Sequence, residues 1–324
     1  MNARLNFNAI FYIVILSTII SCSTININGS ISEYKAPEKG IVLSIISEQN
    51  EIRIRNPNGY TDPRASILIV ALDEVYFNNK RLNALDSVLS DLKGFNFVSQ
   101  ISKDIRTSVS EIGWLIIDKK LSSRTHLHNI LKVGTHRLLF NTKYEFTPNM
   151  DSIEVTVFVS LEKVTKVKQQ LTKKVRKYTT IYENRYKYIS PIANPIEIIR
   201  NDFPGTNNEL KKILGQNKKK FSPIEKIQLM SKYWSFNNSS KVKKYLMEAI
   251  NRTKKMISHD LSFKKSLTDT EYYNSLVNHN QFYWKIDAFD NRLFLESNSW
   301  FKKGNLCSIP VNAETHRCTD SIHH

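Results

Sequence analysis

Cys307 and Cys318 lie close together near the C-terminal end of the chain, where they could form a covalent bond. In an oxidising compartment two such thiols pair, which closes a loop and stabilises the tail by roughly 3 kcal/mol in the chain-entropy model. Free thiols are one alternative, and a zinc site completed by His316, His323 and His324 is another. Because the spacing matches no C-x-x-C pattern of a structural zinc site, we predict a disulfide and no metal.

Lysine and arginine are the second group of residues that could bind a partner. The chain has 47 Lys and Arg against 30 Asp and Glu, a formal net charge of +17. Residues 163–265 hold 25 basic and 7 acidic residues, whereas the rest of the chain holds 22 basic and 23 acidic. Clustered cations attract anionic partners such as glycans or lipid head groups. The residues predicted to contact such a partner are Lys173, Lys174, Arg176, Lys177, Lys243, Lys244, Lys254 and Lys255.

A basic segment of this kind can also arise without any binding role, in two ways. Lys, Ile and Asn make up 100 of the 324 residues, the bias expected where codons rich in A and T are favoured. Part of the positive charge can therefore reflect composition rather than binding. Lysines also suit a solvated edge strand, where they block pairing with another sheet, and the outer face of a helix.

The sequence contains no local motif for catalysis or nucleotide binding. No two of the nine glycines lie closer than ten positions, which excludes the G-x-G-x-x-G loop, the P-loop and the G-x-S-x-G elbow. His126, His128 and His136 have no acidic residue near them that could complete a metal site, so we expect surface histidines. Asp73 and Glu74, near the end of a predicted strand, could form a carboxylate pair for acid–base catalysis, but adjacent strand residues point to opposite faces, so we expect surface roles. We therefore predict no catalytic residue, no cofactor and no metal.

The first 21 residues have the layout of a secretory signal. Arg4 precedes an apolar run from Ala9 to Ile20, and these twelve residues are too short as a helix to cross a hydrocarbon core of about 30 Å. Ile19-Ile20-Ser21-Cys22 resembles the lipobox of bacterial lipoprotein precursors. The resemblance implies cleavage before Cys22, acylation of that residue and, because Ser23 follows it, an outer-membrane location facing the periplasm. An ordinary cleaved signal or an uncleaved anchor is the alternative.

The periodicity of apolar residues predicts the elements that must position these groups. Alternation predicts a β-hairpin that pairs 138–146 with 153–161, and a further strand over 178–188. Ser222-Pro223-Ile224-Glu225 is a capping box that predicts the start of a helix, and the strongest amphipathic pattern runs from Val242 to Ile257. The expected fold class is α+β, with antiparallel β-hairpins packed with several amphipathic helices.

Composition and turn residues divide the chain into five segments. A last hairpin is expected from Phe282 to Ser299, followed by a short strand from Leu306 to Ile309. The predicted segments are a signal peptide (1–21), a flexible tether (22–40), an α+β domain (41–190), a linker (191–221), and a basic helix pair with a C-terminal hairpin (222–324).

These observations predict where the protein resides better than what it does. We expect a lipid-anchored cell-envelope protein that acts as a non-catalytic structural or assembly factor, with the membrane as its partner through the lipid anchor. A binding module for anionic glycan or lipid and an envelope hydrolase without a recognisable local motif are the alternatives. Basic residues interleaved with aromatic ones also suit nucleic acid, but an exported protein rarely meets it, so we expect no nucleic-acid partner.

Overall fold

The structure is a computed structural model, and it describes residues 37, 39–47, 49, 51–55, 83–121, 132–170, 173–199, 203, 205–214, 221–262, 271–274, 282–289, 292–299, 302–311 and 318. At several strand positions, including 166–170 and 173–177, only the backbone is described. The predicted signal peptide, the lipobox with Cys22, most of the predicted tether, the Asp73–Glu74 pair and the histidines at 126 and 128 lie outside the described residues.

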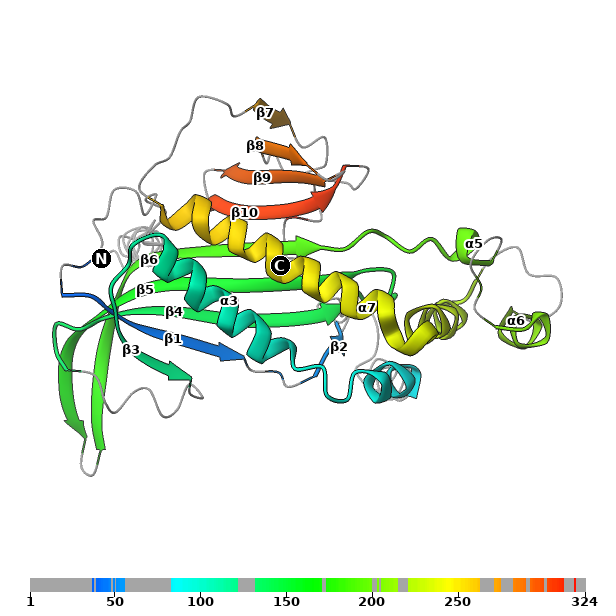
Figure 1. Cartoon of the computed structure of the whole chain (residues 1–324), viewed down its shortest axis with the longest axis horizontal. Coiled ribbons are helices and arrows are strands. Elements are labelled where there is room, and N and C mark those ends of the chain that lie inside the picture. Colours follow the sequence, from blue (N-terminus) through cyan, green and yellow to red (C-terminus); the bar gives the residue numbers. More distant parts are fainter. Residues whose placement is uncertain are drawn as a thin grey trace, which may run out of the picture.

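Ten strands in the described part of the chain form one mixed sheet at the centre of the molecule (Figure 1). In sheet order they are β3 (Ile116–Leu121), β1 (Ile41–Ser47), β4 (His136–Phe146), β5 (Ile153–Gln170), β6 (Lys173–Ile189), β10 (Lys302–Pro310), β9 (Arg292–Ser299), β8 (Phe282–Phe289) and β7 (Glu271–Asn274), with β2 (Arg53–Ile54) paired to the end of β4.

The sheet contains two antiparallel groups of strands, and its parallel pairs lie at one edge and between the two groups. β4, β5 and β6 are antiparallel neighbours, as are β10, β9, β8 and β7. The pairs of β1 with β3, β1 with β4, β2 with β4, and β6 with β10 are parallel. The parallel pair between β6 and β10 joins the two antiparallel groups into one sheet.

Two long helices, α3 (Phe97–Glu111) and α7 (Pro223–Leu261), lie side by side across one face of the sheet (Figure 1). The capping box at the start of α7 is formed: the Ser222 hydroxyl accepts from the Glu225 N–H, and the Glu225 carboxylate accepts from the Ser222 N–H at 2.7 Å. The shorter helices α5 (Pro195–Glu197) and α6 (Asn207–Leu214) precede α7, and residues 83–91 are also helical.

A kink divides α7 near its middle. Asn237, Asn238 and Ser239 have φ angles of 52°, 53° and 53°, in the left-handed region that asparagine tolerates better than most residues. Ser239 is fully buried, and its hydroxyl donates to the Asp91 carboxylate at 3.0 Å. This contact fixes the kink against the helical segment 83–91, so the two halves of α7 pack at different angles.

The main core lies between the helices and the sheet. Val155, Val157 and Val159 alternate along β5 on the face that meets α3 and α7, and each is at most 2% exposed. Burial of one such side chain stabilises the fold by about 1.5 to 3 kcal/mol. Trp234 of α7 is also fully buried, and its indole N–H donates to the Met150 carbonyl at 2.5 Å. The apolar face of the strands therefore fixes where the helices lie.

The structure confirms a mixed α+β fold and adds pairings that local periodicity did not predict. The range 191–221, expected to be a linker, contains α5 and α6. Beyond it, α7 packs on β5 and β6, and β10 pairs with β6. The division into domains stays a prediction. Among the described helices, none combines the length and the apolar character needed to cross a bilayer.

Candidate anion-binding sites

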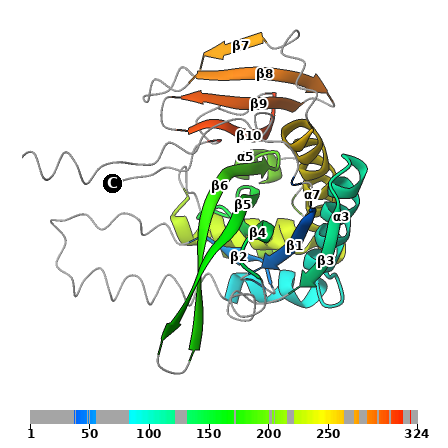
Figure 2. The ribbon, with the colours of Figure 1, turned by 90° about the vertical axis from the view of Figure 1, so that its left-hand side faces the viewer.

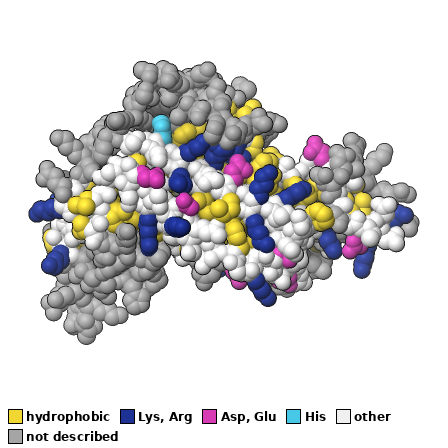
Figure 3. Space-filling model, viewed as in Figure 1, with side chains coloured by type: hydrophobic (Ala, Val, Ile, Leu, Met, Phe, Trp, Pro, Cys, Tyr) yellow, Lys and Arg dark blue, Asp and Glu magenta, His cyan; other side chains and the backbone are white. Residues whose placement is uncertain are grey.

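Three of the four lysines predicted on α7 make contacts within the fold. Lys243 donates to the Asn238 carbonyl at 2.8 Å, and the Lys244 ammonium lies 5.9 Å from the centre of the Tyr245 ring. Lys254 lies 3.6 Å from the Asp104 carboxylate of α3. Figure 3 shows that the basic side chains on the face covered by α3 and α7 are dispersed among apolar and acidic ones. Each of these three lysines thus has a contact within the fold, and their role in binding stays a prediction.

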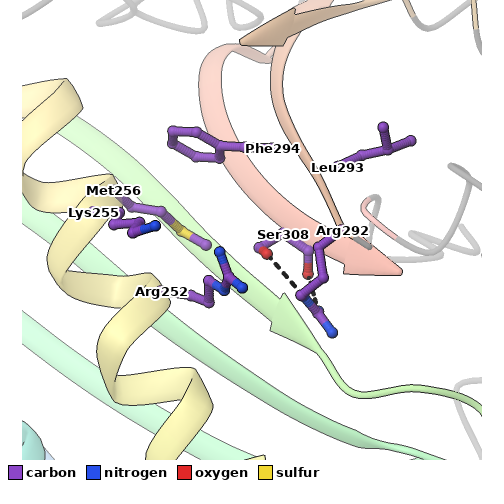
Figure 4. Close-up of a pocket in the computed structure, with 7 residues that line it drawn as sticks. All are labelled: Arg252, Lys255, Met256, Arg292, Leu293, Phe294 and Ser308. Atoms are coloured by element: carbon purple, nitrogen blue, oxygen red, sulfur yellow. Dashed lines mark hydrogen bonds between the residues drawn. The ribbon is translucent and has the colours of Figure 1, made fainter. Parts of the chain in front are cut away.

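Lys255, the fourth predicted lysine of α7, lines a small pocket between α7 and the strands β9 and β10 (Figure 4). Arg252 and Met256 project from α7 toward Arg292 of β9 and Ser308 of β10. The space between these side chains is about 20 Å³. That volume holds about one water-sized group, so a polymer can reach only the mouth of the pocket.

Arg292 is the central cation of this pocket and is 4% exposed. Its Nε donates to the Ser308 hydroxyl at 3.2 Å, and its Nη2 donates to the Ser308 carbonyl at 2.9 Å and to the Ile189 carbonyl. The Glu248 carboxylate lies 3.5 Å from Arg292 and 3.9 Å from Arg252. Burial is the main cause that lowers the pKa of Arg292, and the charge of Arg252 adds to it. These contacts join α7 to the C-terminal strands.

Sequence reasoning did not single out Arg292. It predicted the hairpin that contains this residue but not that the side chain is buried. The available signal was a cation followed directly by Leu293, Phe294 and Leu295, two of which are buried in the structure. A cation at the start of a strongly apolar strand needs hydrogen-bond partners, and here carbonyl groups of β6 and β10 provide them.

The disulfide predicted between Cys307 and Cys318 is present, with Cα atoms 5.7 Å apart. Both residues are buried in a small apolar cluster with Ile189 of β6 and the apolar residues of β9 and β10. The Cys318 carbonyl accepts from Arg185 of β6 at 3.2 Å. The disulfide therefore attaches Cys318, beyond the end of β10, to the sheet. The histidines at 316, 323 and 324, offered as zinc ligands, lie outside the described residues.

The distal half of the β5–β6 hairpin holds the densest group of predicted binding residues. We call residues 166–170 and 173–177 the basic ribbon. Six of its ten residues are Lys or Arg, and no acidic residue occurs between Glu162 and Glu183. Four of the six are the predicted binding residues Lys173, Lys174, Arg176 and Lys177, and the other two are Lys166 and Lys168.

The basic ribbon extends beyond the body of the sheet (Figures 1 and 2). The first residue of β4, His136, pairs with Lys163 of β5, and β4 does not continue beyond this position. β10 pairs with β6 only at Tyr186, Lys187 and Tyr188. Beyond these positions β5 and β6 pair only with each other in the described part of the chain. Over the basic ribbon, β5 and β6 therefore continue as a two-stranded extension of the sheet.

The register of the basic ribbon places one pair of lysines opposite each other in the backbone ladder. Lys166 is the direct partner of Lys177 in the antiparallel ladder. Like charges directly opposite one another on a sheet are destabilising, so stability alone does not favour this arrangement. An anion bound between them would relieve the repulsion.

Nearer the body of the sheet, the cations of the same region are paired with carboxylates. The Lys187 side chain is 2% exposed, and its ammonium lies 3.0 Å from the Glu154 carboxylate, which also contacts Arg55. Arg137 of β4 donates from Nε to Glu162 at 3.0 Å, and its guanidinium lies 4.2 Å from the centre of the Tyr178 ring. Lys187 and Arg137 are therefore both paired with carboxylates inside the sheet.

Comparison of the chain with protein-family models, with curated proteins and with solved structures finds no match. No three His, Cys, Asp or Glu residues within the described ranges are arranged to hold a metal ion. The function must therefore be argued from the residues of this chain.

Proposed function

We propose that the protein is a lipid-anchored cell-envelope protein that acts as a non-catalytic structural or assembly factor and holds an anionic envelope component with its basic ribbon. The observation that carries the proposal is the ribbon: six cations in ten residues on a two-stranded extension, with no acidic residue between Glu162 and Glu183. In this proposal the antiparallel hairpins and the amphipathic helices packed on them form the platform that presents the ribbon.

The lipobox resemblance supports the location. Acylation of Cys22 would anchor the mature chain, and several acyl chains together hold a protein firmly on a membrane where one would not. A chain on the outer membrane facing the periplasm meets two abundant polyanionic materials, glycan strands and anionic lipid head groups. Both present repeated anionic oxygens, which is the chemistry that a row of lysines attracts.

The binding proposal is tested by reversing the charge of the ribbon. A variant with Lys173, Lys174, Arg176 and Lys177 all changed to Glu is compared with wild type for retention on purified cell-wall glycan and on phosphatidylglycerol vesicles. Phosphatidylcholine vesicles are the uncharged control. We expect the reversal to abolish retention on one of the two anionic materials, and that material identifies the partner.

A matched control separates a local effect from an effect of net charge. Lys103, Lys132, Lys211 and Lys212 are exposed and lie outside the ribbon, so changing all four to Glu alters the net charge by the same amount. We expect this control variant to be retained like the wild type. If the ribbon variant is retained as well as the control on both materials, the ribbon is not the binding site.

The anchor is tested by metabolic labelling. Labelled palmitate is expected to enter the wild-type protein in bacterial cells and not the Cys22→Ala variant, because the thiol of Cys22 is the acceptor that the resemblance implies. Equal labelling of the two proteins would refute the lipid anchor while leaving the binding proposal standing.

A further inference from the structure

The polar residues of the small pocket between α7 and the strands β9 and β10 are three cations and one hydroxyl (Figure 4). The cations are Arg252, Lys255 and Arg292, and the hydroxyl belongs to Ser308. Among the described residues that line the pocket, none carries a carboxylate. Positive charge and hydrogen-bond donors in the lining favour an anion over a cation as the ligand.

Two of these cations lie close to each other. The Glu248 carboxylate lies 3.5 Å from Arg292 and 3.9 Å from Arg252, so two guanidinium groups share one carboxylate. Burial is the main cause that lowers the pKa of Arg292, and the positive charge of Arg252 is a further cause. The ammonium group of Lys255 brings a third positive charge to the same pocket. An anion among the three cations would reduce the repulsion between them.

Ser308 supplies a buried hydroxyl whose position is fixed. The residue is 2% exposed, and its hydroxyl accepts from the Arg292 Nε at 3.2 Å. A serine hydroxyl that accepts a hydrogen bond still has its own proton for a second one. Ser308 can therefore donate to an anion in the pocket while Arg292 holds its oxygen in place.

The size of the pocket restricts the ligand. Its volume is about 20 Å³, which is enough for one water-sized group. A chloride ion is only slightly larger than a water molecule. Phosphate and sulfate carry four oxygens around a central atom and exceed this volume. The interior of the pocket therefore suits an anion that consists of a single atom.

The apolar part of the lining indicates which single-atom anion is favoured. Met256, Leu293 and Phe294 complete the lining, and their side chains donate no hydrogen bond that could replace water. A strongly hydrated anion such as fluoride loses much of its hydration energy against such a surface. Chloride is hydrated more weakly, and charge-assisted hydrogen bonds from the polar residues can offset the loss.

We propose that this pocket binds one chloride ion, which is held by Arg252, Lys255 and the Ser308 hydroxyl. The ion lies between α7 and the strands β9 and β10, so its binding stabilises the packing of these strands on the helix. Lys255 was predicted from the sequence to contact an anionic partner, and the proposal assigns it a single ion. The site is independent of the basic ribbon.

The proposal is tested by thermal unfolding while chloride replaces gluconate at constant ionic strength. A ligand that binds only the folded protein stabilises it by an amount that grows with the ratio of its concentration to Kd. The Tm of the wild type is expected to rise with the chloride concentration as this relation requires. Bromide should act in the same way, because it is also a weakly hydrated single-atom anion, whereas gluconate is too large to enter.

Lys255→Met tests the role of the cations. The change removes one positive charge from the lining and keeps an unbranched apolar side chain, and we expect about tenfold weaker chloride binding from the loss of one charge-assisted hydrogen bond. Lys103→Met is the matched control. Lys103 is exposed on α3 and does not line the pocket, so the control changes the net charge equally and should respond to chloride like the wild type.

Arg252→Gln is the second variant, and it replaces Lys255→Met if that protein does not fold. We expect it to lose the response to chloride. Sulfate stabilises folded proteins because it is excluded from their surface, so it should raise the Tm of the wild type and of all three variants equally. A difference that appears with chloride and not with sulfate therefore reports the pocket.

Two outcomes would overturn the site: equal effects of chloride and gluconate on the wild type, which would mean that the pocket holds water only, or an unchanged chloride response in both pocket variants. Crystals grown with bromide locate the ion by anomalous scattering, and a bromide bound only elsewhere would also contradict the proposal. The four-residue charge reversal in the ribbon should leave the chloride response unchanged. Failure of this proposal and failure of the ribbon proposal are thus separate results.

Discussion

The two halves of the β5–β6 hairpin differ in the acidic residues that accompany their cations. Within the sheet, Lys187 is paired with Glu154 and Arg137 with Glu162, and these cations are almost entirely buried. In the basic ribbon, Lys166 is the ladder partner of Lys177, and the sequence has no acidic residue between Glu162 and Glu183. Cations that are paired with carboxylates inside the fold must therefore be excluded before the charge of a segment is taken to indicate binding.

Glu154→Gln, within the sheet, is expected to change the free energy of unfolding the most. The change leaves the buried Lys187 ammonium and the Arg55 guanidinium without the carboxylate that they share, and loss of one partner of a buried ion pair costs about 3 kcal/mol. Chemical denaturation should show this loss in the free energy of unfolding. Lys174→Met in the ribbon is the contrasting variant, with an expected change within about 0.5 kcal/mol. Similar changes in both variants would remove the distinction between the two halves.

An alkaline titration should produce the next largest effect, because β6 carries buried tyrosines next to the paired cations. Burial is the main cause that raises the pKa of Tyr186 and Tyr188 above the usual 10.0. A group whose pKa is raised by folding contributes stability below its unfolded pKa and loses it as pH rises through the folded one. Above pH 10, each tyrosine should lower the free energy of unfolding by about 1.4 kcal/mol per pH unit.

This titration is measured by denaturant unfolding at increasing pH, with phenolate absorbance to follow ionisation. Tyr188→Phe should show a shallower loss of stability at alkaline pH than the wild type. An equal slope in the two proteins would mean that Tyr188 ionises in the folded state as it does in the unfolded chain.

The smallest effect is expected from relieving repulsion in the ribbon. Lys166→Gln combined with Lys177→Gln removes a pair of like charges that face each other, which should stabilise the fold by a few tenths of a kcal/mol, about 0.3. The same variant should bind the anionic partner more weakly, and the difference should shrink as salt is added. Opposite signs for stability and binding would indicate that the charges serve a partner. A loss of both would indicate a structural role.

Local patterns in the sequence account for the elements better than for their partners. The alternation over 153–161 marks the same valines that the structure buries, and the capping box at Ser222 is formed at the start of α7. The parallel pairs of β1 with β4 and β6 with β10 join residues far apart in the chain. Periodicity states which face of a strand is apolar and does not state which strand lies beside it.

The candidate sites also differ in how far the sequence alone predicts them. The basic ribbon was visible as a run of cations without acidic residues. The pocket at Arg292 was not visible, because it is built from three elements, α7, β9 and β10, that only the folded chain brings together. The contacts of the α7 lysines with Asn238 and Asp104 could be recognised only in the structure, and their role in binding stays a prediction.

The parallel pair between β6 and β10 also sets an order of events during folding. Tyr186, Lys187 and Tyr188 pair with residues 306–308, which are synthesised more than 100 residues later. Until then this edge of β6 has no neighbouring strand, and open edges of this kind pair readily with other chains. Contacts between residues so far apart in sequence form slowly. The early-made part of the sheet must therefore stay soluble, or bound to a chaperone, until the last strand arrives.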